Sequence, residues 1–547
     1  MDKRTITAFI MIFLVAFSYP YIMQKLFPHL SPPPPEEEVI TDEENEKLSK
    51  EEAVQSPAQE HEKDLPQEKE EFSLETFEEK KIPLAIGDVS FTFSNRGGSI
   101  SSVEFLKYQT SFDYSSSEEY VLAISSIGRF SGLENMQFTI EEQTDTRIVW
   151  QSILKEENLK IEKIFETTDK DYLYTVRLKL TNLGPEKFYM ERGPVIVSGS
   201  IITQEKKRRY AVEEATALRV DDEIQRIPKK KIEGALWMDS KYRWVGLQEP
   251  TVCFILMNRD KAIDGWGVSK KIELIKGNGK EEKGASETEI ITTMAKLEVA
   301  DIPPGDSVTY NMTFYAGPKL YYHLASIGND FKRILDFGKM LAPISRGIIW
   351  GLNKLFHVFH NYGICIIIIT IIVKIILYPL THSSMKSMKR MKDLQPHMEA
   401  IREQYKDDPQ RMNREVLALY KKHKVNPVGG CFPIFLQLPI FIALFKTLNN
   451  AVELKGASFL WIKDLSAPDT IFMIGSFPVN VLPLIMGLTQ FISQKQTVTD
   501  QKQAQMMYFM TVFFMFIFYN MPSGLVLYWL ISNVLSIIQQ GMINKKT

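Results

Sequence analysis

Residues 362–380 read YGICIIIITIIVKIILYPL, an apolar run that contains one charged residue, Lys374. A helix of about 20 apolar residues crosses the ~30 Å hydrocarbon core of a bilayer, so this run predicts a membrane-spanning helix. A charge inside such a span costs roughly 2.5–3.5 kcal/mol on insertion scales. Either the lysine stem reaches back to the membrane surface, or the ammonium group lies in a wet groove between helices. Thr370, one turn earlier on the same face, favours the groove.

The composition of the whole chain predicts neither a metal centre nor a cofactor site. The 547 residues carry a formal net charge of -2, which averages an acidic segment and a basic one. The three cysteines, Cys253, Cys365 and Cys431, lie far apart without C-x-x-C spacing, so neither a disulfide framework nor a zinc site is indicated. No G-x-x-x-x-G-K-[ST] run for nucleotide phosphates is present. We expect no catalytic residue and no cofactor.

Two segments precede the first region with a folding pattern. Residues 1–24 begin with Asp2-Lys3-Arg4 and continue as an apolar stretch, which predicts a transmembrane signal anchor with its N-terminus in the cytoplasm. A cleavable signal peptide is the alternative, since Ala16-Phe17-Ser18 is a small-x-small site. Residues 25–81 are rich in proline, glutamate and lysine, and this composition predicts a disordered tether.

Residues 82–320 show the period-two pattern of β-strands. Residues 172–180 alternate apolar and polar side chains over a full strand, and the turn sequence Asn182-Leu183-Gly184 follows. Repeated short strands of this kind predict an all-β antiparallel sandwich, which lies beyond the anchor and therefore on the extracytoplasmic side.

The predicted sandwich offers few residues for chemistry. Histidines are absent between His61 and His323, which argues against a histidine-based triad or metal cluster. A small set of acidic and tryptophan residues either lines a sugar-binding cleft or belongs to core and surface: Asp239, Asp264, Trp237, Trp244 and Trp266.

Helical periodicity returns at residues 321–361. The segments Tyr321–Phe337 and Ile348–His360 are amphipathic, and in the second Leu352, Leu355 and Phe359 share one face. Such a segment directly before a spanning helix is typical of a helix that lies in the membrane interface.

Residues 382–427 form a basic polar loop, which the positive-inside rule places in the cytoplasm. Within it apolar residues recur every three or four positions on both sides of Asp407-Asp408-Pro409, and this predicts a helical hairpin. Its apolar seam is rich in methionine, a flexible side chain that suits many apolar partners. The seam either captures client segments or closes on the partner helix, through Met388, Met391, Met398 and Met412.

Four more apolar spans follow the hairpin, at residues 428–448, 479–494, 506–521 and 523–543. With residues 362–380 they make a bundle of five spans, and the anchor is a sixth. Polar residues fall inside these spans: Gln437 in one, and in the last a stripe of Tyr528, Ser532, Ser536 and Gln539.

The chain resembles the YidC/Oxa/Alb family of membrane protein insertases from end to end. Four stretches carry the resemblance: YGICIIIITIIVKIILYPLT, NPVGGCFPIFLQLPIFIALF (residues 426–445), LWIKDLSAPD (460–469) and MPSGLVLYWLISNVLSIIQQ (521–540). The order of parts is that of the Gram-negative members. The resemblance implies a galactose-mutarotase-like β-sandwich in the periplasm and a transmembrane core at residues 362–547.

The resemblance also implies which residues line a hydrophilic groove. The family's groove carries one positive residue, usually arginine, and Lys374 holds that position here. Lysine keeps the charge but lacks the forked donor geometry of arginine. Thr370 matches a polar groove position, and the family's paired tyrosines appear as Tyr528 and Trp529, so the second hydroxyl is absent. Gln437 and Ser532 complete the expected groove.

The implied activity is insertion of nascent hydrophobic segments into the bacterial inner membrane, without covalent catalysis, alone or with the Sec translocon. The expected partners are nascent membrane proteins, the ribosome transiently, Sec translocon components and anionic lipid, with no specific nucleic acid. Two alternatives come from other classes. One is an anion or solute transporter with an extracytoplasmic receptor domain, and the other is a carbohydrate-active enzyme on a membrane anchor.

Overall fold

The computed structural model describes residues 77–547 apart from residues 109, 116–118, 126–132, 205–212, 276–285, 339–340, 424, 426–431, 476, 498–500 and 546–547. The predicted anchor and nearly all of the predicted tether lie outside the described residues, as does Cys431.

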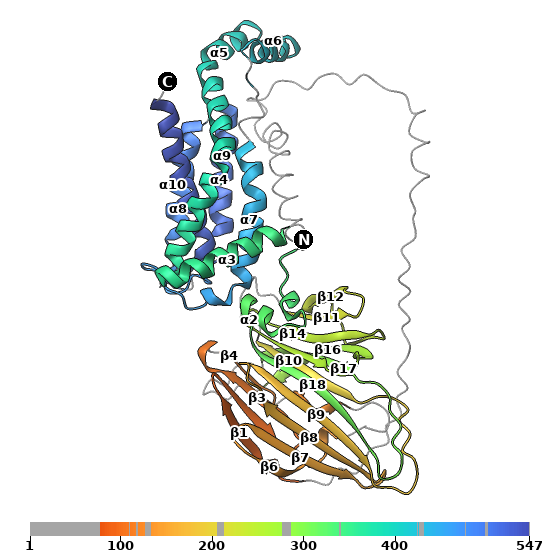
Figure 1. The fold of residues 1–547 in the computed structure, drawn as a ribbon. Helices are drawn as coiled ribbons and strands as arrows, with labels where there is room; N and C mark the ends of the chain where they lie inside the picture. The colour runs from red at the N-terminus through yellow and green to blue at the C-terminus, as the bar shows by residue number, and fades with distance from the viewer. Residues whose placement is uncertain are drawn as a thin grey trace, which may run out of the picture. The chain divides into compact units, whose positions relative to one another are not determined.

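Antiparallel strands fill the chain from Lys81 to Pro318 (Figure 1). They form a four-stranded sheet in the order β1-β2-β3-β4, a five-stranded sheet β13-β16-β17-β10-β5 and a nine-stranded sheet β12-β11-β14-β15-β18-β9-β8-β7-β6. The strand bounds are β1 Lys81–Ile86, β2 Val89–Ser94, β3 Ser99–Phe105, β4 Thr110–Asp113, β5 Ile124–Ser125, β6 Thr139–Gln143, β7 Arg147–Leu154, β8 Leu159–Thr167, β9 Leu173–Asn182, β10 Val195–Gln204, β11 Glu214–Arg219, β12 Ile224–Pro228, β13 Ala235–Met238, β14 Tyr242–Gln248, β15 Val252–Asn258, β16 Gly265–Ile275, β17 Ser286–Lys296 and β18 Ser307–Pro318.

The core of the sandwich lies where these sheets pack together. Strand β10 crosses β14 and β15, and at Gly199 an added Cβ would lie 2.8 Å from the Cβ of Phe254. Only glycine allows so close an approach. Phe254 is fully buried among other aromatic rings, with Phe314 stacked 6.2 Å away between ring centroids. The predicted all-β sandwich is confirmed.

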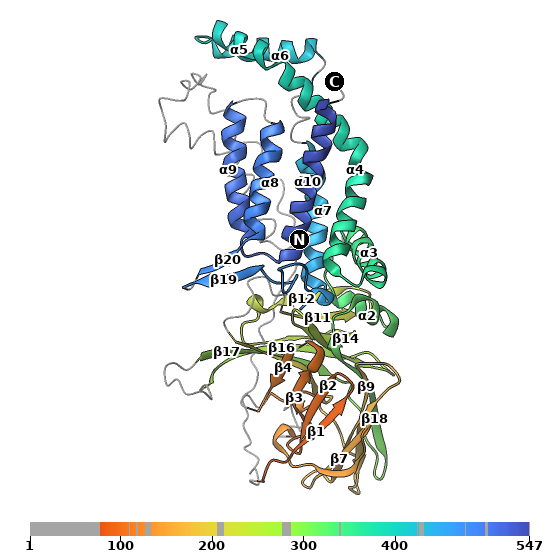
Figure 2. The same ribbon diagram turned by 90° about the vertical axis from the view of Figure 1, so that its left-hand side faces the viewer.

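Helices fill the rest of the described chain: α2 Tyr321–Ile327, η6 Phe331–Ile334, α3 Ala342–Phe359, α4 Tyr362–Asp393, α5 Gln395–Gln404, α6 Pro409–Lys422, α7 Phe432–Asn450, η8 Val452–Leu454, α8 Leu482–Thr497, α9 Gln501–Phe518 and α10 Ser523–Lys545. A two-stranded hairpin, β19 Thr470–Ile474 and β20 Phe477–Asn480, precedes α8. Figures 1 and 2 show α4, α7, α8 and α10 side by side.

Two of the described helices are long and apolar enough to cross a membrane, at Tyr362–Asp393 and Ser523–Asn544. Shorter apolar helices occur at Gln437–Leu448 and Met507–Phe518. The helical C-terminal region is therefore confirmed, while the count of five spans stays a prediction.

The amphipathic segments differ from their predicted form. The segment from Tyr321 breaks after Ile327, because Gly328 has a φ of 93° that a helix does not contain. The second helix, α3, begins before its predicted start and buries Ile348, Ile349 and Leu352. Phe359, predicted to share a face with Leu352, is 44% exposed.

Helix α4 continues through Pro379, where the sequence predicted the end of the first span. Proline lacks an N–H, so the carbonyl of Ile375 one turn earlier loses its helical donor, yet the helix continues to Asp393. The last two spans are joined by residues 519–522 rather than by Pro522 alone.

Candidate functional site

The predicted groove lysine bonds to the last helix. Lys374 on α4 is partly buried, and its Nζ donates to the Oγ of Ser536 on α10 at 2.9 Å. Ser536 in turn donates to the carbonyl of Ser532 at 2.9 Å. An ammonium group has three N–H donors, and Ser536 is the one acceptor for Lys374 within the described chain. The charge therefore keeps donor capacity for a further group.

A second polar contact joins the same two helices seven residues further along α4. Gln539 Nε2 donates to Thr381 Oγ1 at 3.0 Å, and both residues are buried. Residue numbers rise together along the two helices, so α4 and α10 run parallel. The predicted stripe on α10 therefore faces α4 through Ser536 and Gln539.

Tyr528 and Trp529, the predicted pair, point to different helices. Gln437 on α7 donates through Nε2 to the Tyr528 hydroxyl, and Tyr528 is buried. Trp529 donates through Nε1 to Gln490 Oε1 on α8 at 3.2 Å. The Trp529 ring also lies 5.1 Å from Phe441 and 5.2 Å from Phe518, centroid to centroid. This pair thus ties α10 to α7, α8 and α9.

The side chains of Thr370 and Ser532 make no hydrogen bond to another helix among the described residues. Thr370 is fully buried, but its hydroxyl donates to the carbonyl of Ile366 in its own helix at 2.7 Å. Ser532 is buried, and its backbone carbonyl accepts the hydrogen bond from Ser536. Among the predicted residues, direct polar contacts between helices come from Lys374, Gln437, Tyr528 and Trp529.

Sequence reasoning missed three polar residues of the bundle. Thr381 bonds to Gln539 as described, and Thr511 on α9 donates to Gln494 Oε1 on α8 at 2.6 Å. Asn533 is buried, and its Nδ2 has no hydrogen-bond partner within the described residues. Thr511 and Asn533 lie inside predicted spans and Thr381 directly follows one, which the sequence shows. Only the packing of the helices determines which polar side chains contact one another.

The methionines of the seam have different surroundings in this structure. Met388 lies in an apolar cluster with Met385 and Ile543. Residues Arg390–Pro427 belong to another compact unit, in which Met391 packs with Leu394 and Val425.

Within the same unit, the Tyr420 hydroxyl lies 3.4 Å from the Met398 sulfur, and Met412 is partly exposed. Met391 and Met398 thus pack on their own hairpin and Met388 packs with α10, so both alternatives for the seam stay predictions.

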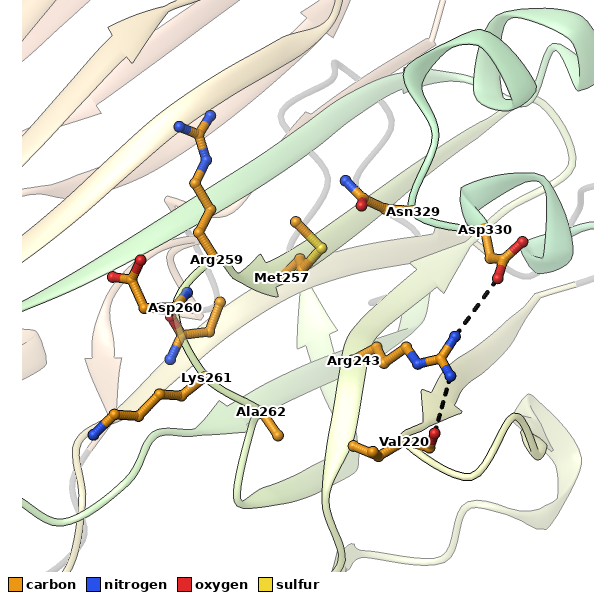
Figure 3. Close-up of a pocket in the computed structure, with 10 residues that line it drawn as sticks. Val220, Arg243, Met257, Arg259, Asp260, Lys261, Ala262, Asn329 and Asp330 are labelled. Atoms are coloured by element: carbon orange, nitrogen blue, oxygen red, sulfur yellow. Dashed lines mark hydrogen bonds and ion pairs between the residues drawn. The ribbon is translucent and has the colours of Figure 1, made fainter.

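A pocket of about 390 Å³ lies on the sandwich, and none of its lining residues is a predicted site residue (Figure 3). Arg243 borders it and bonds to the carbonyl of Val220 at 3.0 Å and to Asp330 at 3.7 Å. Two of the three tryptophans proposed for a sugar cleft serve the core instead, since Trp244 and Trp266 are fully buried, while Trp237 is partly exposed. No cluster of three metal-ligating side chains occurs among the residues that the structure describes.

Comparison with known proteins places the chain in a family. Residues 354–547 match the family model described as 60Kd inner membrane protein, and residues 274–351 match the YidC periplasmic domain. A membrane protein insertase YidC of Geotalea daltonii is 31% identical over 472 residues, which cover 83% of this chain and 84% of that protein. The chain belongs to the YidC family of membrane protein insertases.

Other relatives match over shorter stretches. A membrane protein insertase YidC of Geobacter metallireducens is 48% identical over 245 residues, which make up 44% of each protein. With this relative the chain therefore aligns over less than half of the relative's length. By the descriptions of the two matched models, the YidC family consists of inner-membrane proteins with a periplasmic domain.

Two solved structures are also similar. A crystal structure of an active YidC insertase with its first transmembrane domain resolved is 20% identical, covers 85% of this chain and 92% of its own, and has a TM-score of 0.39. A putative aldose 1-epimerase from Escherichia coli K12 is 11% identical, covers 44% of this chain and 100% of its own, and has a TM-score of 0.27. Likenesses this low carry no argument, so the mutarotase-like form of the sandwich stays a prediction.

Proposed function

We propose that this YidC-family chain inserts nascent hydrophobic segments into the inner membrane through polar groups inside its helical bundle. The observation that carries the proposal is Lys374, a charge within the apolar run of a helix long enough to cross a membrane. Its one acceptor among the described residues is Ser536, so donor capacity is left over. In the proposed topology, an N-terminal anchor and five bundle spans cross the membrane. The N-terminus and the hairpin then face the cytoplasm, and the sandwich faces the periplasm.

The polar groups act by lowering the cost of carrying a client's polar residues into hydrocarbon. An unpaired polar group there costs several kcal/mol. Lys374 attracts acidic groups and carbonyls of the client, while Gln437 and Ser532 offer further donors and acceptors. The apolar segment then moves into lipid, driven by the removal of apolar surface from water. No bond is made or broken, so the chain acts as an insertase and chaperone rather than as an enzyme.

The methionine seam is proposed as the first contact of a client segment. In the described state Met391 and Met398 pack inside the hairpin, so capture requires the two helices of the hairpin to separate. Flexible methionine side chains adapt to unlike apolar partners once exposed. The ribosome, Sec translocon components and anionic lipid are the further proposed partners, the last through the basic residues of the loop.

An insertion assay tests the role of Lys374. The full chain is reconstituted in liposomes, and a single-span client with a short acidic N-terminal segment is presented on stalled ribosomes. Protease protection of the acidic segment measures insertion. Lys374→Ala is expected to lower insertion about three- to twentyfold, since one polar contact in hydrocarbon is worth roughly 0.6–1.7 kcal/mol and 1.4 kcal/mol is tenfold. Lys374→Arg retains the charge and is expected to retain insertion.

Lys389→Ala is the matched control. It removes the same charge from the same helix, but Lys389 bonds to the carbonyls of Ile543 and Asn544 near the end of α10. Equal loss in both alanine variants would mean that net charge matters and the position of Lys374 does not. Insertion into protein-free liposomes at the same level would overturn the proposed function itself.

The solute-transporter alternative is not supported, since the relatives named above are insertases. The carbohydrate-active alternative loses part of its support because two of its three tryptophans, Trp244 and Trp266, are fully buried.

A further inference from the structure

The loop between α7 and α8 carries an exposed apolar hairpin. In β19 the side chains of Phe472, Met473 and Ile474 are all exposed, with Ile474 65% exposed. Phe477, opposite Ile474 in β20, is 60% exposed. Figure 2 shows β19 and β20 projecting from the end of the bundle near α8 and α9. A soluble surface rarely gathers such large apolar side chains.

The apolar side chains occupy both faces of the hairpin. Successive residues of a strand point to opposite faces, so Phe472 and Ile474 lie on one face and Met473 on the other. The chain carries no charged residue from Thr470 to Gln494. A protein partner resting on one face would leave the other in water, whereas a lipid environment covers both.

A polar network at the base fixes the hairpin to two helices. Asp469 Oδ2 accepts from the backbone N–H groups of Val481 and Leu482 at 3.1 and 2.7 Å, next to the start of α8. Asn480 Nδ2 donates to the carbonyl of Tyr519, just past α9, at 2.6 Å. The Tyr519 hydroxyl donates to the carbonyl of Pro478 at 2.7 Å. The polar side chains are thus satisfied at the base, and the apolar ones project away from it.

The apolar surface of the hairpin continues onto the neighbouring helices. Leu488 on α8 is 61% exposed, and Phe516 on α9 is 80% exposed. Trp461, which donates to Asp469 Oδ2 at 3.2 Å, is also partly exposed. Tryptophan and tyrosine gather where a membrane protein crosses from hydrocarbon to headgroups.

We propose that the β19–β20 hairpin lies in the lipid interface at the extracytoplasmic end of the bundle, with its tip side chains among the acyl chains. A two-stranded sheet has unpaired backbone groups along both edges, which the hydrocarbon centre does not tolerate. The hairpin therefore lies near the headgroups and does not cross the membrane. This inference rests on the proposed function, since it requires the bundle to span the membrane.

Fluorescence quenching of the full chain in phosphatidylcholine–phosphatidylglycerol liposomes tests the proposal. An environment-sensitive fluorescent amino acid is placed singly at Ile474, Phe516 or Leu183, the last an exposed residue of the sandwich. The quenchers are iodide in water and nitroxide-labelled lipids with the label near the headgroup or near the chain end. At Ile474 we expect iodide quenching about fivefold weaker than at Leu183, and stronger quenching by the shallow nitroxide than by the deep one. A probe at Phe472 repeats the test in case the first variant does not fold.

Three other results separate the explanations. Iodide quenching at Ile474 equal to that at Leu183, with Phe516 still quenched by lipid, would place the hairpin in water and overturn the inference alone. Shielding of Ile474 from both iodide and nitroxide would mean that protein covers it, as in an association of two copies, and would also overturn it. Strong iodide quenching at Phe516 would instead count against the spanning bundle and so against the proposed function.

Discussion

The sandwich and the helical bundle place many of their large apolar side chains differently. In the sandwich, Phe254 and Trp266 are fully buried and aromatic rings pack against one another. In the bundle, Phe516 and Ile376 are largely exposed, while hydroxyl and amide groups such as that of Gln539 are buried. The hydrophobic effect selects the first arrangement in water. The second is stable where the outside is hydrocarbon and polar groups must find partners inside.

Buried lysines show the same contrast. In the sandwich, Lys163 donates to the carbonyls of Gly97 and Leu122 at 2.8 and 2.5 Å, and its burial lowers the pKa to about 7. These backbone acceptors hold the ammonium group in one place. Lys374 has a single serine hydroxyl among the described residues. Two backbone carbonyls thus hold Lys163, whereas Lys374 keeps more unused donors, which we propose serve a client.

The largest expected effect comes from one substitution made in both regions. Phe254→Ala is expected to destabilise the sandwich by about 3–5 kcal/mol, because it empties a packed site among Phe105, Phe112 and Phe314. Phe516→Ala is expected to change the stability of the bundle by less than about 0.5 kcal/mol, since the Phe516 side chain is 80% exposed and its removal loses few packing contacts. Hydrogen exchange of the full chain in lipid nanodiscs, followed in β15 and α9, measures both. Equal losses of stability in the two regions would contradict the contrast between the sandwich and the bundle.

A smaller effect on stability is expected from Glu453, which lies in the loop after α7. Glu453 Oε2 is buried without a hydrogen-bond partner among the described residues, although the residue as a whole is partly exposed. Burial raises the pKa of Glu453 to about 7, above its value of 4.5 in an unfolded chain. The folded state binds the proton more tightly, so stability falls as pH rises from about 4.5 through about 7. In contrast, the buried Glu214 of the sandwich is paired with Arg226 at 2.6 Å.

Glu453→Gln removes this titration. It is expected to raise the free energy of unfolding by roughly 1–3 kcal/mol above pH 7 and to leave it unchanged at acid pH. The measurement is the denaturant midpoint of the full chain in detergent as a function of pH. Glu104→Gln, at an exposed position of β3, is the control and is expected to keep the wild-type pH dependence. A Glu453→Gln variant with the same pH slope as wild type would contradict the assignment.

The smallest expected effect separates two buried threonines of α4. Thr381→Val removes the contact with Gln539 on α10 and is expected to cost roughly 0.6–1.7 kcal/mol. Thr370→Val is the matched control, because the Thr370 hydroxyl bonds only within its own helix to Ile366, and less loss is expected. Denaturation in mixed micelles measures both variants. A larger loss in Thr370→Val would show that own-helix bonds matter more than contacts between helices.

Local patterns predicted the types of the elements well. The alternation at residues 172–180 marks β9, and the run at residues 362–380 marks the apolar part of α4. Boundaries were less accurate at single residues. Helix α4 continues through Pro379, and Gly328 ends α2 inside a segment with helical periodicity. These outcomes depend on single contacts and dihedral angles, which periodicity does not contain.

The candidate site was predictable in part. Lys374, Gln437 and Tyr528 stood out because polar residues inside an apolar run are costly, and each makes a contact between helices. Thr370 stood out for the same reason, yet its hydroxyl stays within its own helix. Thr381 and Asn533 were missed because the rotation of each helix decides which polar side chain meets a neighbour.

The sequence by itself predicted an all-β region followed by a region of apolar helices. A period of two over residues 82–320 predicts strands with one buried face, and the long apolar runs after residue 362 predict membrane-spanning helices. The tertiary structure decided the partners: Ser536 for Lys374, Gln437 for Tyr528, and an uncovered β19–β20 hairpin. Partners are set by helix rotation and depth, which come from the packing of residues far apart in the chain.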